Sequence, residues 1–128
     1  MQVHDFHLRG YEVLDFGSTI VLDTVYDYPN EPKRETTVRF EGVELYKFRH
    51  TSGAIISDIE PVPLNQVIKR NGNFIRSAAA NYGVKGWQSD LEQYADYLVT
   101  IGAHGWTVTS SVGFDGFVIA RSVREMRA

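Results

Sequence analysis

The feature that most constrains the fold of this chain is a change in hydrophobic periodicity close to its midpoint. Between residues 3 and 62 apolar side chains tend to recur at every second position, which is the pattern of strands with one buried face. From Leu64 onward the spacing lengthens to about 3.6 residues, the period of an amphipathic helix. Pro61 and Pro63 mark the boundary, because proline lacks the backbone donor that a continuing ladder needs. The sequence therefore predicts an antiparallel N-terminal β-sheet followed by helices, an α+β fold.

Glycine and proline residues divide the N-terminal part into predicted strands. The segments are 4–8, 11–16, 19–28, 34–41, 43–50 and 54–60. A loop is predicted at 29–32, Pro-Asn-Glu-Pro, since these residues favour turns over a ladder. The longest strand is Thr19 to Tyr28. If it lay at a sheet edge it would allow pairing with a second copy, so a homodimer is expected.

The C-terminal part predicts two or three helices and a closing hairpin. Asn71-Gly72 interrupts the first helical stripe and divides it into a short helix and a second helix over 73–82. Ser89 and Glu92 form a capping box for the next helix, which Gly102 ends. Segments 106–112 and 117–122, joined by a turn at 113–116, then form a C-terminal β-hairpin, after which the last six residues are expected to fray.

Length and composition indicate one domain over residues 1–128, with 1–62 mostly β and 63–128 helices followed by a hairpin. A chain of 128 residues is near the common size of a single domain. Its content of 43% hydrophobic and 23% charged residues is typical of globular proteins and excludes a disordered chain.

The absence of cysteine excludes disulfides, thiolate nucleophiles and cysteine metal ligands. The N-terminal residues lack the basic start and apolar stretch of a signal peptide, and no apolar run reaches the roughly 20 residues that cross a bilayer. We therefore predict a cytoplasmic protein without a membrane partner.

The formal charge of −3 is unevenly distributed along the chain. Residues 1–62 hold 11 acids and 6 bases, a net −5, and residues 63–128 hold 5 acids and 7 bases, a net +2. Neither half clusters Lys and Arg as nucleic-acid binding requires, so no nucleic-acid partner is predicted. An acidic sheet face could bind a basic protein, although a solvated surface is the more common reason for such a charge.

No spacing in the chain predicts a metal site or catalytic chemistry. His4 and His7 are three apart on a predicted strand and so face opposite sides of the sheet. Asp23 and Asp27 share a face but lie roughly 13 Å apart, too far to hold one metal ion. The serines form no nucleophile elbow, and phosphate-binding glycine motifs are absent. We predict no metal, no cofactor and no catalytic residue, and favour a non-catalytic role while leaving enzyme activity open.

Six residues are candidates for binding. Asp23 and Asp27 would form the acidic face, and Tyr28 would lie at its rim beside the predicted loop. Trp87 precedes a helix in a polar stretch, where it is either a hydrophobic staple or an exposed anchor for a partner. Arg39 or His50 would lie at the mouth of a cleft between sheet and helices.

Two stretches resemble small uncharacterised bacterial proteins. Residues 38–48, followed by 54–59, resemble the strand pattern of immunity-like proteins from bacterial toxin systems. Residues 98–121, with Gly105-Trp106 after a helix, look like the ending of another small bacterial family. The resemblance implies a protein-binding role and assigns no residue a function.

Three functions remain open from the sequence. The leading hypothesis is a small bacterial protein-interaction domain, immunity-like or an adaptor, that binds through the acidic face or Trp87. The second is a small-molecule binder with a cleft lined by aromatic residues, Tyr26, Tyr46, Phe48 and Tyr94. The third is a hydrolase-like enzyme in which His50 or His104 works with a carboxylate.

Overall fold

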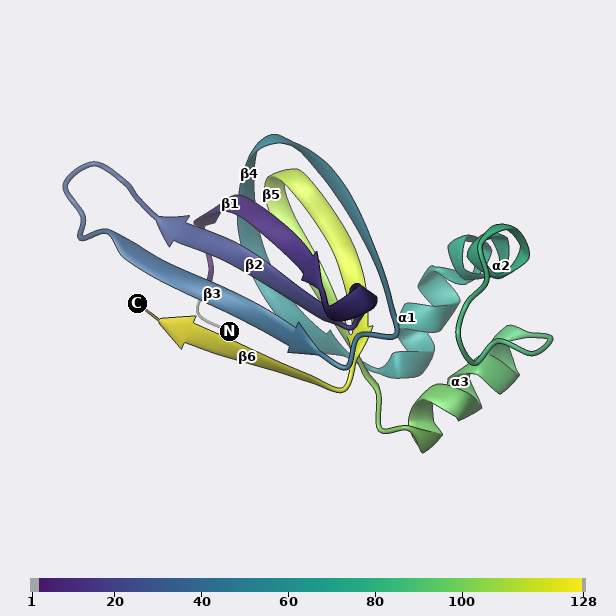
Figure 1. The fold of residues 1–128 in the computed structure, drawn as a ribbon. Helices are drawn as coiled ribbons and strands as arrows, with labels where there is room; N and C mark the ends of the chain where they lie inside the picture. The colour runs from purple at the N-terminus through teal and green to yellow at the C-terminus, as the bar shows by residue number, and fades with distance from the viewer. Residues whose placement is uncertain (1–2, 128) are drawn as a thin grey trace.

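A computed structural model describes residues 3–127 of the chain, and it confirms an α+β fold with six strands and three α-helices (Figure 1). The elements in chain order are β1 (Phe6–Leu14), the short 3-10 turn η1 (Asp15–Gly17), β2 (Thr19–Tyr26), β3 (Arg34–Glu41), β4 (Leu45–Val62), α1 (Leu64–Arg70), α2 (Gly72–Asn81), α3 (Leu91–Thr100), β5 (His104–Ala120) and β6 (Ser122–Arg127). Residues 1, 2 and 128, which belong to the predicted domain, lie outside the described part.

The strands form one antiparallel sheet in the order β5-β4-β1-β2-β3-β6. β5 and β6 stand at opposite ends of this order, yet only Arg121 separates them along the chain. The backbone N–H of Arg121 donates to the carbonyls of Glu41 and Gly42, at 3.0 and 3.2 Å. The sheet must therefore curl until its two ends meet, and Figure 1 shows the long β4–β5 pair arching over the other four strands.

Two groups of buried side chains stabilise this arrangement. The first lies inside the curled sheet and includes Ile20, Leu22, Phe40, Ile56 and Val118, all fully buried. The second joins the helices to the outer side of β4 and β5, and its central members are Val67, Ile75, Tyr94, Leu98 and Ile119. The helices gather at the β4–β5 end of the molecule (Figure 1), so the outer face of β1, β2, β3 and β6 lies away from them.

The predicted strand segments of the N-terminal part merge into four strands. A register shift between Leu8 and Gly10 lets β1 continue where a break was predicted. Residues 51–54 of β4 bulge opposite Gly113 of β5, so the segments 43–50 and 54–60 belong to one bent strand. In both places a turn-forming residue marks a bulge within a strand, which a local pattern cannot distinguish from a turn.

The C-terminal pair of strands is present as β5 and β6, but the predicted turn at 113–116 is wrong. These residues continue β5, and a side chain at Gly116 would bring its Cβ within 2.0 Å of the Lys47 carbonyl oxygen. Glycine is therefore needed there for close approach to β4. The prediction that the end frays is also wrong for 123–127, which pair with β3.

The three helices follow the predicted pattern closely. The predicted division at Asn71 separates α1 from α2, and the third helix begins after Asp90, whose carboxylate accepts a hydrogen bond from the Gln93 N–H. Asp90 is thus the N-cap where Ser89 was predicted. The predicted edge strand is instead interior, because β2 pairs with β1 on one side and β3 on the other. A homodimer formed through β2 is therefore excluded.

Candidate functional site

The most unusual surface feature is the turn between β1 and β2. Asp15 and Phe16 both adopt left-handed backbone conformations, with φ of 53° and 59°, and Gly17 follows at 90°. This region is sterically unfavourable for residues with a side chain, and most of all for a bulky one. The Phe16 ring is nonetheless fully exposed to solvent.

The turn is held in place by its own hydrogen bonds. The Ser18 N–H and hydroxyl both donate to the Asp15 carbonyl, at 3.2 and 2.7 Å, and the Thr19 hydroxyl donates to the Asp15 carboxylate at 3.2 Å. The Val43 N–H donates to the Ser18 carbonyl at 2.8 Å, which ties the turn to the β3–β4 connection. The exposed ring is therefore displayed from a fixed position. Val13 and Leu14, which precede the turn, are also exposed.

A groove with a volume of about 420 Å³ lies beside this turn. Phe16 and Ser18 line one side, and Leu45 and Tyr46 at the start of β4 line another. Lys85, from the connection between α2 and α3, completes the rim. We call this feature, the 15–18 turn together with the groove, the Phe16 site.

A buried carboxylate lies at the base of the groove. The Glu44 side chain is only 5% exposed and accepts a hydrogen bond from the Tyr97 hydroxyl at 2.9 Å. The guanidinium of Arg121, which also lines the groove, is 4.0 Å from its other oxygen. A buried charge is stable only when paired and hydrogen-bonded, and Tyr97 and Arg121 provide both.

Two tyrosines of α3 respond to this carboxylate. Burial raises the pKa of Tyr94 well above its ordinary value, and the nearby charge of Glu44 raises it further. Burial and the hydrogen bond to Glu44 also raise the pKa of Tyr97. The Tyr94 hydroxyl is buried without a hydrogen-bond partner in the described part of the chain.

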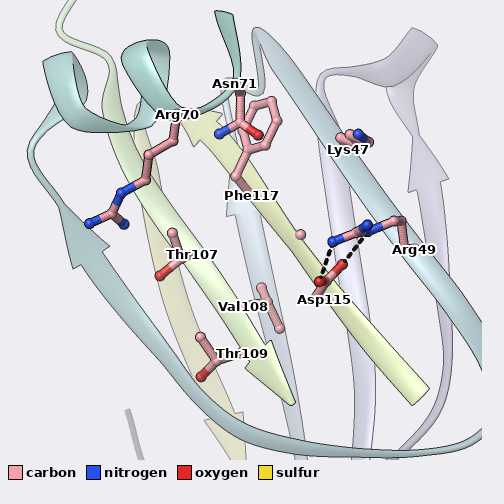
Figure 2. Close-up of a pocket in the computed structure, with 10 residues that line it drawn as sticks. Lys47, Arg49, Arg70, Asn71, Thr107, Val108, Thr109, Asp115 and Phe117 are labelled. Atoms are coloured by element: carbon pink, nitrogen blue, oxygen red, sulfur yellow. Dashed lines mark hydrogen bonds and ion pairs between the residues drawn. The ribbon is translucent and has the colours of Figure 1, made fainter. Parts of the chain in front are cut away.

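A second, smaller pocket lies where the outer face of β4 and β5 meets the end of α1 (Figure 2). It has a volume of about 240 Å³ and is lined by Lys47, Arg49, Arg70 and Asp115 together with polar side chains of β5. Arg49 donates to both oxygens of Asp115, at 2.8 and 2.7 Å. We call it the basic pocket.

The predicted acidic face is electrically balanced in the structure. Arg9 donates to both oxygens of Asp23, at 3.1 and 2.8 Å, and to Glu35 at 3.1 Å. These contacts raise the pKa of Arg9, the bond to Asp23 more than that to Glu35. Asp27 lies beyond the end of β2 and is exposed. The two predicted acids thus do not form one acidic surface.

Arg39 belongs to the same charge-balanced network. It donates to Glu41 at 3.2 Å, and Arg124 of β6 contacts the same carboxylate at 2.9 Å. Arg39 lies on β3, whereas His50, the other residue considered for the mouth of the cleft, lies on β4 directly before its bulge.

The two predicted aromatic anchors are engaged within the fold. The Tyr28 hydroxyl donates to the Asp5 carbonyl at 2.7 Å, and its ring packs on His7 and Tyr26. Trp87 is partly buried against the helical group, 6.0 Å from the Tyr94 ring centre. This placement fits the interpretation of Trp87 as a staple.

The residues of the predicted aromatic cleft do not share one space. Tyr94 is buried in the helical group, whereas Tyr46 and Phe48 pack against the sheet core. Tyr26 stacks with Phe6 and the guanidinium of Arg34. The four aromatic residues therefore do not line one cleft, although Tyr46 does line the groove of the Phe16 site.

The histidines of the hydrolase hypothesis are both exposed. His50 packs against Tyr11 and Phe114, and His104 against Trp106. Within residues 3–127 neither makes a hydrogen bond or ion pair with a carboxylate; the histidine that does so is His4, with Asp5 at 3.4 Å. The geometry gives this hypothesis no support.

The described residues contain no group of three His, Asp or Glu side chains placed to hold a metal ion. None of the helices between residues 3 and 127 has the length and apolar composition of a bilayer-spanning helix.

No protein-family model matches the chain, and no curated protein matches it significantly. The resemblance to immunity-like proteins therefore stays a prediction.

Sequence reasoning missed the residues that form the Phe16 site. Phe16 was assigned to the end of a strand, and Glu44 was not among the candidate binding residues. The segment Asp15-Phe16-Gly17-Ser18 did carry a signal, because Asp, Gly and Ser favour turns and here surround a single aromatic residue.

Proposed function

We propose that this chain is a non-catalytic protein-recognition domain whose contact with its partner is centred on Phe16. The observation that carries the proposal is a fully exposed phenylalanine ring fixed on a left-handed turn. Aromatic side chains dominate the binding energy of protein interfaces, and a backbone that is already held in one conformation loses little entropy on binding.

The surroundings of the ring support the same role. Val13 and Leu14, which precede the turn in β1, are also exposed, while Lys85 and Arg121 provide charged groups to the lining of the groove. An apolar centre with a polar rim is the usual anatomy of an interface. Backbone strain at an exposed residue is also easier to explain by binding than by folding, because the exposed ring contributes no packing.

The test compares three forms of the chain as bait in a lysate of the native host: the wild type, Phe16→Ala and Tyr82→Ala. Tyr82 is the matched control, an exposed aromatic at the end of α2 and outside the Phe16 site. A partner captured by the wild type and by Tyr82→Ala, and lost with Phe16→Ala, supports the proposal. Toxins of bacterial toxin systems are the first class to look for, because residues 38–48 and 54–59 resemble immunity-like proteins of such systems.

The captured partner is then purified and its affinity measured by calorimetry. Phe16→Ala is expected to weaken binding by about 30-fold or more, the loss of an interface hot spot of about 2 kcal/mol. Equal affinity of the wild type and Phe16→Ala would contradict the proposal. The melting temperatures of both variants should match the wild type, which shows that only the contact has changed.

A cytoplasmic location stays a prediction from the cysteine-free sequence.

A further inference from the structure

The basic pocket concentrates positive charge in a chain whose net charge is −3. Its lining holds Lys47 and Arg49 from β4, Arg70 from the end of α1, and one carboxylate, Asp115. Three separate elements, α1, β4 and β5, therefore bring their polar side chains to one depression (Figure 2).

The single carboxylate is already neutralised. Arg49 binds both of its oxygens, and this hydrogen bond lowers the pKa of Asp115, which keeps the pair ionised at neutral pH. A bidentate pair of this kind is geometrically fixed. The pocket thus has an excess of two positive charges, those of Lys47 and Arg70.

Neither of these two cations has an ion pair within residues 3–127. The Lys47 ammonium lies 4.9 Å from the centre of the Phe74 ring, a contact that leaves its N–H donors without a carboxylate. Arg70 makes one long hydrogen bond, 3.5 Å, to Gln66. Most other cations of the sheet surface, Arg9, Arg39 and Arg124 among them, contact carboxylates at 3.2 Å or less.

Hydroxyl groups complete the lining. Thr107 and Thr109 of β5 lie below Arg70 in Figure 2, across the pocket from the Arg49–Asp115 pair. The Thr109 hydroxyl makes only a long contact, 3.4 Å, with the Asp58 carbonyl, so it can reorient toward a ligand. Guanidinium, ammonium and hydroxyl donors together are the groups that bind tetrahedral oxyanions.

We propose that the basic pocket binds a small dianionic oxyanion, either phosphate or a phosphomonoester. Two uncompensated cations match a double negative charge better than a single one. The volume of about 240 Å³ lies below the roughly 300–1,000 Å³ of pockets for drug-sized ligands, so the site suits a small group. This inference is independent of the Phe16 site.

The test is a titration of the full chain with inorganic phosphate at constant ionic strength, followed by backbone amide chemical shifts. Shifts should saturate and centre on residues 47, 70, 107 and 109. Lys47→Gln and Arg70→Gln are each expected to weaken binding by about tenfold, the usual effect of losing a charged hydrogen-bond donor. Lys69→Gln is the matched control, since Lys69 is the neighbouring exposed cation on α1 and does not line the pocket.

A gain-of-binding variant keeps the test decisive if a loss variant is destabilised. Asp115→Asn removes the one carboxylate and frees Arg49, so phosphate should bind several-fold more tightly. The proposal would be overturned by any of three results: chemical shifts that do not saturate, an equal loss of phosphate affinity in Lys69→Gln and Arg70→Gln, or no gain of affinity in Asp115→Asn.

Two further ligands identify the chemistry that the site prefers. Glycerol phosphate binding more tightly than inorganic phosphate would assign a phosphomonoester, and weaker or equal binding would assign free phosphate. Acetate is a monoanion and should bind much more weakly than either. A response to acetate equal to that of phosphate would show that the pocket is not selective for a dianion and would overturn the inference.

Discussion

The outer face of the β1-β2-β3-β6 sheet and the Phe16 site are both exposed, but they use their exposed residues in opposite ways. On the sheet face, charges of one sign lie beside charges of the other, as Arg9 does between Asp23 and Glu35. At the Phe16 site an apolar ring is presented to water from a backbone conformation that disfavours it. The first arrangement favours solubility, whereas the second contributes nothing evident to the fold.

The difference shows that net charge along the sequence is a poor guide to surface potential. The N-terminal half carries a net −5 of formal charge. Its acids are nonetheless distributed among cations, and Arg124 from the far end of the chain pairs with Glu41. Ion pairs between strands determine the surface potential, and the residues that form them are far apart in sequence. The following variants separate the two regions, beginning with the largest expected effect on stability.

Glu44→Ala should lower the free energy of unfolding by about 2 kcal/mol, because it removes a buried side chain and leaves the half-buried Tyr97 hydroxyl without its acceptor. Glu44→Gln keeps an acceptor and should lose less. Glu41→Ala, the matched change on the sheet face, removes exposed ion pairs and should lower stability by less than about 1 kcal/mol. Urea denaturation measures all three, and an equal effect of Glu41→Ala and Glu44→Ala would remove the distinction between the regions.

Tyr94→Phe should raise stability by about 1 kcal/mol at neutral pH, because it removes a buried hydroxyl that has no partner. The pKa of Tyr94 is raised in the folded state, so the hydroxyl ionises more readily in the unfolded chain. Below about pH 10, the pKa of an unfolded tyrosine, this ionisation does not affect stability, and above it the free energy of unfolding of the wild type falls as pH rises. The variant should therefore lose stability less steeply than the wild type in alkaline buffer. Thermal melts across that range would show parallel curves if this were wrong.

Phe16→Gly should raise stability by up to about 1 kcal/mol, since glycine adopts a positive φ freely and the gain exceeds its larger unfolded entropy. Phe16→Ala keeps the backbone strain and should leave the melting temperature unchanged. A gain in stability with Phe16→Gly, combined with loss of partner binding, would show that strain is retained for recognition. Destabilisation by both variants would instead mean that the ring supports the fold.

Arg9→Gln should have the smallest effect, and only at low salt. The contacts of Arg9 with Asp23 and Glu35 are exposed and screened by ions. Melting curves of the variant and the wild type should coincide at high salt, and partner affinity should be unchanged. A large loss of affinity would return the sheet face to the centre of the interface.

Periodicity was sufficient to predict the fold class and the three helices. The apolar stripe around Val67 and Ile75 and the division at Asn71 are local signals, and the structure follows them. Breaks within strands were overpredicted, because Gly10 and Gly116 indicate a turn locally but permit a bulge or a close approach in the folded sheet. What decides between these outcomes is the partner strand, which the local sequence does not specify.

The candidate sites were less predictable for the same reason. Lys47 and Arg49 lie close together on β4, but Arg70 lies at the end of α1, and only the packing of α1 on β5, the neighbour of β4 in the sheet, brings all three to one pocket. Asp23 and Arg39 do lie on an exposed sheet face, as predicted. The sequence did not indicate that Arg9 and Arg124 would lie on the same face and pair with its acids. Phe16 differs, because its turn is local and could have been recognised from Asp15, Gly17 and Ser18.

The meeting of β5 and β6 at Arg121 has a consequence for how quickly the chain reaches its native state. The β3–β6 ladder joins segments far apart in sequence, as the Thr37 and Met126 contact spans 89 residues. Sheets built from such distant pairings fold slowly, because loop-closure entropy is lost before the contacts form. Until β6 arrives, β3 presents an unpaired edge that other chains can join. Refolding should therefore be slow and concentration-sensitive, with protection of the β6 amides and of the β3 amides that face β6 appearing last in pulsed hydrogen exchange.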